Sequence, residues 1–193
     1  MKYMAVGLAA LVLAGPSGLH AQNRVPTNLP SQVTLRAVLV DLTDGQFLGI
    51  RSSMNPPAGV PAAVYRWNQA QREYDRSIDL AMLRELGLPA VDSAEFEFAS
   101  DTSAATRYQL RATIEQLRID FAREAWVTVR WDLYDAVRGK LVGSFRSKGY
   151  ARTAPGVGTW RPLTVITLAF DVAIEELLAQ DSFVSVLGET PSS

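Results

Sequence analysis

The feature that most constrains the fold is a long stretch, residues 124–150, in which apolar and polar side chains alternate on both sides of a short turn. Alternation with a period of two puts the two sets of side chains on opposite faces of a β-strand. The turn, residues 135–139, ends at Gly139 and has a length typical of hairpin loops. The stretch therefore predicts two antiparallel strands, residues 125–133 and 140–151.

Four further segments read as extended chain. Residues 33–41 are rich in β-branched side chains and alternate, residues 42–50 form a turn followed by a short extended piece, and residues 95–99 form a short strand. In residues 107–121 the apolar positions are even as far as Ile114 and odd from Leu117 onward. Because a slip of one residue would turn a whole face outward, this change predicts a bulge near Gln116.

Two segments have helical periodicity. In residues 65–86, apolar side chains from Trp67 to Leu86 recur at steps of three and four, and Gly87 and Pro89 supply a stop. The second helix covers residues 162–179 and begins at a proline, which suits a first turn. Its first half is apolar nearly all round, so we expect it to be buried in the domain, with a contact between two copies of the chain as the alternative.

The order of these elements predicts an α+β fold. Helices segregated onto one face of a mostly antiparallel sheet form a two-layer sandwich, here with two main helices. We expect a single domain over residues 33–187, preceded by a flexible leader at residues 22–32 and followed by a disordered tail at residues 188–193.

The first 21 residues read as a secretory signal peptide. They combine Lys2, an apolar run over residues 4–14 and a small-residue ending at Ala21. The run is shorter than the roughly 20 residues that span a bilayer, so we expect cleavage after Ala21, no transmembrane segment in the mature chain, and a periplasmic or secreted protein. No cysteine follows the run, which excludes the usual lipoprotein attachment.

Composition excludes several kinds of chemistry. The chain has no cysteine, and its one histidine, His20, falls within the predicted signal peptide. The mature chain therefore lacks histidine-dependent serine triads, cysteine nucleophiles and the usual zinc ligands. A net charge of −1 gives no basic excess for nucleic acid. Carboxylates such as Glu115, Asp120 and Asp132 remain, but no spacing marks a catalytic pair. We expect no enzyme activity, no cofactor and no metal site.

One face of the predicted hairpin combines aromatic and basic side chains. Such surfaces are favoured at protein interfaces; the other interpretation is that cross-strand pairs of this kind only stabilise an exposed sheet. The candidate partner-binding residues on this face are Trp126, Arg130, Tyr134, Arg146, Lys148 and Tyr150.

Several fragments, taken in order, also carry a family resemblance: GQFLG at 45–49, Trp67 and LRELG at 83–87, YQLRATI at 108–114, VTVRWDLYD at 127–135 with GKLV at 139–142, and Ala169-Phe170 leading to Leu177-Leu178 and Ser182-Phe183. This order resembles the exported α+β domain that precedes trypsin-like serine protease domains in some proteobacteria. It is more distantly similar to the auxiliary lipoproteins of ABC-type transport systems. The likeness covers about residues 33–187 but includes neither a protease domain nor a lipobox cysteine.

The resemblance implies an envelope domain that works through contacts with an envelope protein or a transporter component. Together with the export signal, it predicts a non-enzymatic accessory protein. A lipid or small-molecule carrier, with a pocket between the helix at residues 162–179 and the sheet, is the alternative.

Overall fold

The structure is a computed structural model that describes residues 29–50, 64–68, 77–93, 96, 106–121, 123–153 and 162–188. Its main sheet has four strands in the order β1-β5-β6-β7. They are β1 (Val33–Val40), β5 (Tyr108–Asp120), β6 (Glu124–Asp135) and β7 (Leu141–Arg152). β1 runs parallel to β5, and the other neighbours are antiparallel. The predicted α+β class and the predicted hairpin are confirmed.

The predicted bulge in β5 is also confirmed. The register between β5 and β6 shifts between Ile114 and Gln116. Because of this shift, Leu110, Ile114, Leu117 and Ile119 are all buried although their positions change from even to odd. The strand ends at Asp120. Phe121, the next residue, has a positive φ of 53° and is exposed, so the buried apolar face ends at Ile119 and not at Phe121 as the sequence pattern indicated.

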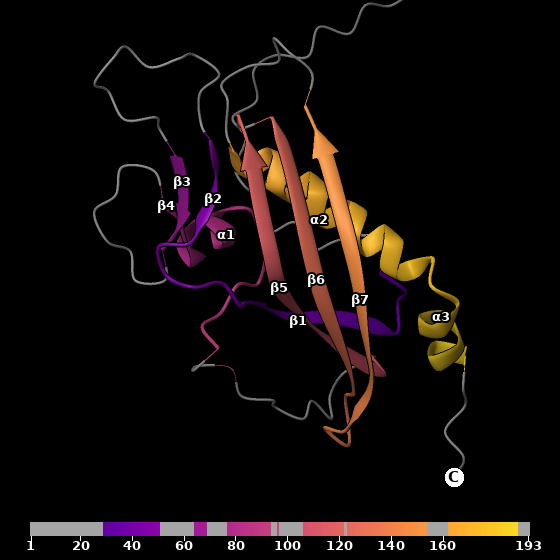
Figure 1. Cartoon of the computed structure of the whole chain (residues 1–193). Helices are drawn as coiled ribbons and strands as arrows, with labels where there is room; N and C mark the ends of the chain where they lie inside the picture. The colour runs from indigo at the N-terminus through magenta and orange to yellow at the C-terminus, as the bar shows by residue number, and fades with distance from the viewer. Residues whose placement is uncertain are drawn as a thin grey trace, which may run out of the picture.

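The helix α2 (Pro162–Leu178) covers one face of this sheet, and Figure 1 shows it crossing behind β5, β6 and β7. Its bounds agree with the prediction to within one residue. The helix lies very close to β7 because a Cβ added at Gly149 would overlap the carbonyl oxygen of Ala169. A buried hydroxyl also joins the layers: Ser147 accepts from Trp131 Nε1 at 2.7 Å and donates to the carbonyl of Ala173 at 2.6 Å.

The all-round apolar character of α2 has a partial explanation in this packing. The side chains that face the sheet are fully buried, and Val165 is buried with them. Leu168 and Val172, however, keep more than a third of their surface exposed. The helix is therefore buried on a wide stripe but not on all sides. A short helix, α3 (Asp181–Gly188), follows it, and Phe183 on α3 packs edge-on against Phe145 of β7 at a ring distance of 5.1 Å.

The helix predicted over residues 65–86 is wrong. Its beginning is the strand β3 (Val64–Trp67), which pairs with β2 (Phe47–Ile50) and β4 (Ser77–Ile78) in a second, small sheet. Among the described residues of this segment, helix is found only at its end, as α1 (Leu80–Glu85), and residues 69–76 lie outside the described ranges. The side chain of Asp79 caps α1 by accepting from the backbone N–H of Met82 at 2.8 Å. The predicted stop is correct, since Gly87 has a φ of 79° directly after the helix.

Several predictions fall on residues outside the described ranges. These are the signal peptide at residues 1–21, the leader up to residue 28, most of the short strand at residues 95–99, and the tail from residue 189 onward. Within the described ranges, no helix has both the length and the apolar character needed to cross a membrane.

Candidate functional site

The six candidate residues lie on one face of the β6–β7 hairpin, opposite the face that packs against α2. The register places Trp126 opposite Tyr150 and Arg130 opposite Arg146, while Lys148 lies opposite Thr128. Residues directly opposite one another in an antiparallel pair point to the same side. We call this side of β5, β6 and β7 the outer face.

One end of the outer face carries an aromatic pair. The rings of Trp126 and Tyr150 lie 5.1 Å apart with a tilt of 33°. The guanidinium of Arg118, on the neighbouring strand β5, lies 5.0 Å from the Trp126 ring centre. Tyr150 is 44% exposed, so the pair is a partly accessible aromatic surface with cations beside it.

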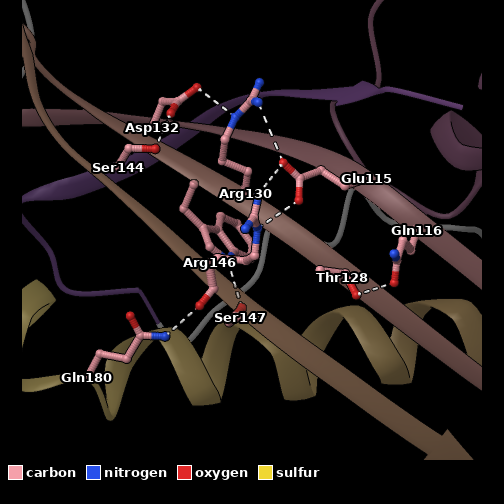
Figure 2. A network of polar contacts seen from close by, with 10 residues as sticks. Glu115, Gln116, Thr128, Arg130, Asp132, Ser144, Arg146, Ser147 and Gln180 are labelled. Carbon is pink, nitrogen blue, oxygen red and sulfur yellow. Dashed lines mark hydrogen bonds and ion pairs between the residues drawn. The ribbon is translucent and has the colours of Figure 1, made fainter.

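Glu115 holds two of the candidate arginines in place. Its carboxylate accepts from Arg146 Nε at 2.8 Å and from Nη2 at 3.1 Å, and it lies 3.5 Å from Arg130 Nη1 (Figure 2). These hydrogen bonds raise the pKa of Arg146. Glu115 is the extra residue of the β5 bulge, so the bulge positions a carboxylate between two like-charged side chains on β6 and β7. Arg146 nevertheless keeps 63% of its side chain exposed.

A second ionic group lies farther along the sheet, around Asp132. Burial by itself raises the pKa of Asp132, but hydrogen bonds from Arg111 at 2.6 Å and Ser144 at 2.7 Å, with the charges of Arg111 and Arg130, bring it below the ordinary value. Burial raises the pKa of the candidate residue Tyr134. Arg111 lies 5.3 Å from the ring of Tyr134, which ties Tyr134 into this group, away from the Trp126–Tyr150 pair.

Lys148 lies where helix side chains cap the edge strand β7. Its backbone N–H donates to the Glu176 carboxylate. Figure 2 shows the neighbouring contact, in which Gln180 Nε2 donates to the carbonyl of Arg146 at 2.9 Å. Exposed strand edges invite pairing with other chains. Glu176 on α2 and Gln180, which follows α2, therefore occupy part of this edge. The exposed side chain of Lys148 stays on the outer face.

The structure thus brings all six predicted residues to one face but divides them into two groups. Trp126, Tyr150 and Lys148 lie toward one end and Tyr134 toward the other, with Arg130 and Arg146 between them. The sequence analysis missed Arg118 and Glu115 as members of this face, because their place depends on the register of β5 against β6. The change of phase at Gln116 was the signal that could have found them.

Three buried polar atoms on β5 find no hydrogen-bond partner among the described residues: Gln109 Oε1, Arg111 Nε and Thr113 Oγ1. Their residues follow one another at alternate positions and therefore share the outer face. Phe96 lies over Arg111, with its ring centre 5.6 Å from the guanidinium. Among the described residues, no three carboxylate or histidine groups gather closely enough to hold a metal ion.

Comparison with known proteins gives limited information. No family model matches the chain, and no curated protein matches it significantly. Solved structures similar to it include a candidate lipoprotein from Caulobacter crescentus (18% identity, 46% of this chain and 74% of that chain, TM-score 0.28). A Xanthomonas campestris protein of the DUF330 family has 13% identity over 81% of this chain and 88% of that chain, with a TM-score of 0.35.

A third similar structure, the hypothetical protein CT253 from Chlamydia trachomatis, has 10% identity over 79% of this chain and 99% of that chain, with a TM-score of 0.28. Likenesses of this size identify no family and no activity for the chain. In particular, none of these structures is described as a domain that precedes a protease, so the first of the two family resemblances gains no support from them.

Proposed function

We propose that this chain is an exported, non-enzymatic binding domain that contacts a protein of the cell envelope through its outer face. The observation that carries the proposal is the Trp126–Tyr150 pair, whose ring centres lie 5.1 Å apart and which is partly accessible, with Arg118 over the Trp126 ring. Tryptophan, tyrosine and arginine are the side chains most enriched at the centres of protein interfaces. The export signal predicted from the first 21 residues supports a place in the envelope.

The positive charges of the outer face indicate which kind of partner this surface would fit. Arg118, Arg146 and Arg152 each keep more than 60% of the side chain exposed although each pairs with a carboxylate. Lys148 adds an exposed cation between them. A partner with an acidic rim around an apolar centre would complement this surface, because rim charges steer association and fix orientation. One candidate for such a partner is a component of a transport system in the envelope.

The carrier alternative is less well supported. The contact between α2 and β7 at Gly149 is so close that a single methyl group would collide with the backbone of the helix. The side chains from Val165 to Leu177 that face the sheet are fully buried. A lipid would have to separate these layers at their tightest point.

Matched aromatic substitutions test the proposal. Tagged forms of the chain carrying Trp126→Ala/Tyr150→Ala or Phe47→Ala are expressed in cells that export them, and the co-purified envelope proteins are quantified. Phe47 is an exposed aromatic side chain on β2, which belongs to the small sheet and not to the main one. We expect at least one protein to fall about tenfold or more with the double substitution and to stay unchanged with Phe47→Ala.

The protein identified in this way is then purified and titrated against each form by calorimetry. Binding by the wild type and by Phe47→Ala, with loss of binding by the double variant, is the expected result. Equal recovery of every protein by all three forms, with each form shown to be folded by its thermal unfolding, would contradict the proposal.

A further inference from the structure

The closed end of the β6–β7 hairpin carries an exposed apolar cluster that includes none of the six candidate residues. We call residues Val137, Arg138, Lys140, Leu141 and Val142 the hairpin tip. The three aliphatic side chains are 63%, 49% and 41% exposed, respectively. Figure 1 shows this turn projecting past β1 and α3 at one end of the sheet. The tip is therefore a convex protrusion and not a groove.

Exposure of two neighbouring aliphatic residues distinguishes the hairpin tip from an ordinary sheet surface. Neighbouring residues of a strand point to opposite faces, yet Leu141 and Val142 are both exposed. The register steps from Gly143, opposite Leu133, to Leu141, opposite Tyr134, which leaves Val142 as an extra residue. Leu141 and Val142 therefore both keep more than two fifths of their surface accessible although they are neighbours in one strand.

Positive charge surrounds these aliphatic side chains. Arg138 and Lys140 are exposed, and neither forms an ion pair with any residue in the described part of the chain. The nearest carboxylate along the chain, Asp135, is turned into the loop, where its Oδ1 accepts from the backbone N–H groups of Val137 at 3.0 Å and Arg138 at 2.8 Å. Within the described part of the chain, the side chains of these two cations therefore stay exposed and unpaired beside the three aliphatic side chains.

We propose that the hairpin tip docks on an anionic lipid surface. Aliphatic side chains that protrude into water, with cations at their base, suit insertion into the boundary between headgroups and acyl chains while the cations meet lipid phosphates. A protein hot spot would instead be expected to contain aromatic side chains, and the tip has none. The tip lies apart from the Trp126–Tyr150 pair, so the domain could hold a protein partner while it rests on a membrane.

Single labels test this docking directly, because the chain has no cysteine of its own. An environment-sensitive dye is attached to Val142→Cys at the tip or to Val184→Cys on α3, a comparably exposed control with 54% of its surface accessible. Both proteins are recovered after export and titrated with phosphatidylglycerol vesicles and with phosphatidylcholine vesicles. We expect a blue shift and a fluorescence rise of about threefold only for the tip label on phosphatidylglycerol.

Unlabelled variants separate the contribution of the aliphatic side chains to lipid binding from that of the two cations. Val137→Asn/Leu141→Asn should lower flotation with phosphatidylglycerol vesicles about tenfold or more, whereas Val184→Asn and Trp126→Ala/Tyr150→Ala should float like the wild type. Arg138→Gln and Lys140→Gln should each lower the partition coefficient about fivefold, the factor that corresponds to about 1 kcal/mol. Adding 0.5 M salt should also lower the partition coefficient of the wild type, because it screens both cations.

Three results would overturn the inference: equal responses from both labels, equal flotation of the wild type and Val137→Asn/Leu141→Asn, or no preference for the anionic lipid. If the tip substitutions abolish binding to an envelope protein while flotation is unchanged, the tip is a protein contact and the lipid assignment is wrong. Because Trp126→Ala/Tyr150→Ala leaves the tip intact, failure of this inference can be told apart from failure of the proposed function.

Discussion

The two faces of β6 differ in what surrounds their buried side chains. On the side of α2, Val127, Val129, Trp131 and Leu133 are fully buried among apolar side chains. On the outer face, Asp132 and Thr128 are also buried, but beside Trp126 and Arg130, which stay partly accessible, and inside ionic and hydrogen-bonded contacts. The inner face specifies the packing of the domain, and the outer face holds polar groups in fixed positions at the surface.

This difference separates stability from recognition. Apolar burial is large and does not depend on direction, so the inner face stabilises the fold whichever partner is present. Exposed ion pairs contribute little to stability but keep side chains oriented. Substitutions on the two faces of one strand should therefore act on different properties.

The sharpest contrast is between two tryptophans on this strand. Trp131→Ala removes a fully buried ring and the hydrogen bond to Ser147, and we expect it to lower the free energy of unfolding by about 3–5 kcal/mol. Trp126→Ala loses a ring contact and a cation contact, together about 1–2 kcal/mol. Urea unfolding of both variants measures the difference. Equal losses of unfolding free energy would mean that the outer face stabilises the fold as much as the buried face does.

A smaller effect is expected where the helix meets the sheet. Gly149→Ala puts a methyl group into the backbone of α2 near Ala169, so the helix must shift, at a cost of about 1–3 kcal/mol. Gly188→Ala, at the end of α3, meets nothing within 4 Å and serves as the control. Thermal unfolding compares them. If Gly149→Ala were as stable as Gly188→Ala, the layers would be less tightly packed than the structure shows.

A pH-dependent effect of similar or smaller size is expected at Asp132. Its folded pKa is below the ordinary value, so its stabilising contribution is complete above the unfolded pKa of about 4 and is lost as the pH falls through the folded pKa. Asp132→Asn should be about 1–3 kcal/mol less stable than the wild type at pH 7. Urea unfolding at a series of pH values should show this gap narrowing below about pH 4. A gap that stays constant down to pH 2 would refute the assignment.

The smallest effect is expected at the exposed pair of Arg152 and Glu124, which are joined at 3.1 Å. Glu124→Gln should change the free energy of unfolding by less than about 1 kcal/mol, and raising the salt concentration should reduce even that difference. The same urea titration measures it. A loss as large as that of Asp132→Asn would show that exposed and buried ionic groups of this sheet are not energetically distinct.

The sequence predicted the main sheet well because its signals are local. The alternation in β6 and β7, the turn before Lys140 and the phase change at Gln116 each depend on neighbouring residues only. The same signals placed the six candidate residues on one face. The contacts of Glu115 with Arg146 and Arg130 were beyond prediction, because they depend on three strands in one register.

The segment from residue 65 to residue 86 shows how a periodic pattern can mislead. Trp67 and Ile78 are both buried, and they lie directly opposite each other in the parallel pair of β3 and β4. Their separation of eleven positions is also about three turns of an α-helix, at 3.6 residues per turn. One spacing therefore satisfied a helix and a pair of strands equally well. Only the end of the segment, with its Asp79 cap and Gly87 stop, carried signals specific to a helix.

The central claim, that the outer face binds an envelope protein, is tested most directly by photo-crosslinking inside cells. A photoreactive side chain replaces Tyr150 in one form of the chain and Phe47 in another, and adducts are identified after irradiation. We expect a discrete adduct with one envelope protein from position 150 and none from position 47. The same adducts from both positions, or none from position 150, would contradict the claim.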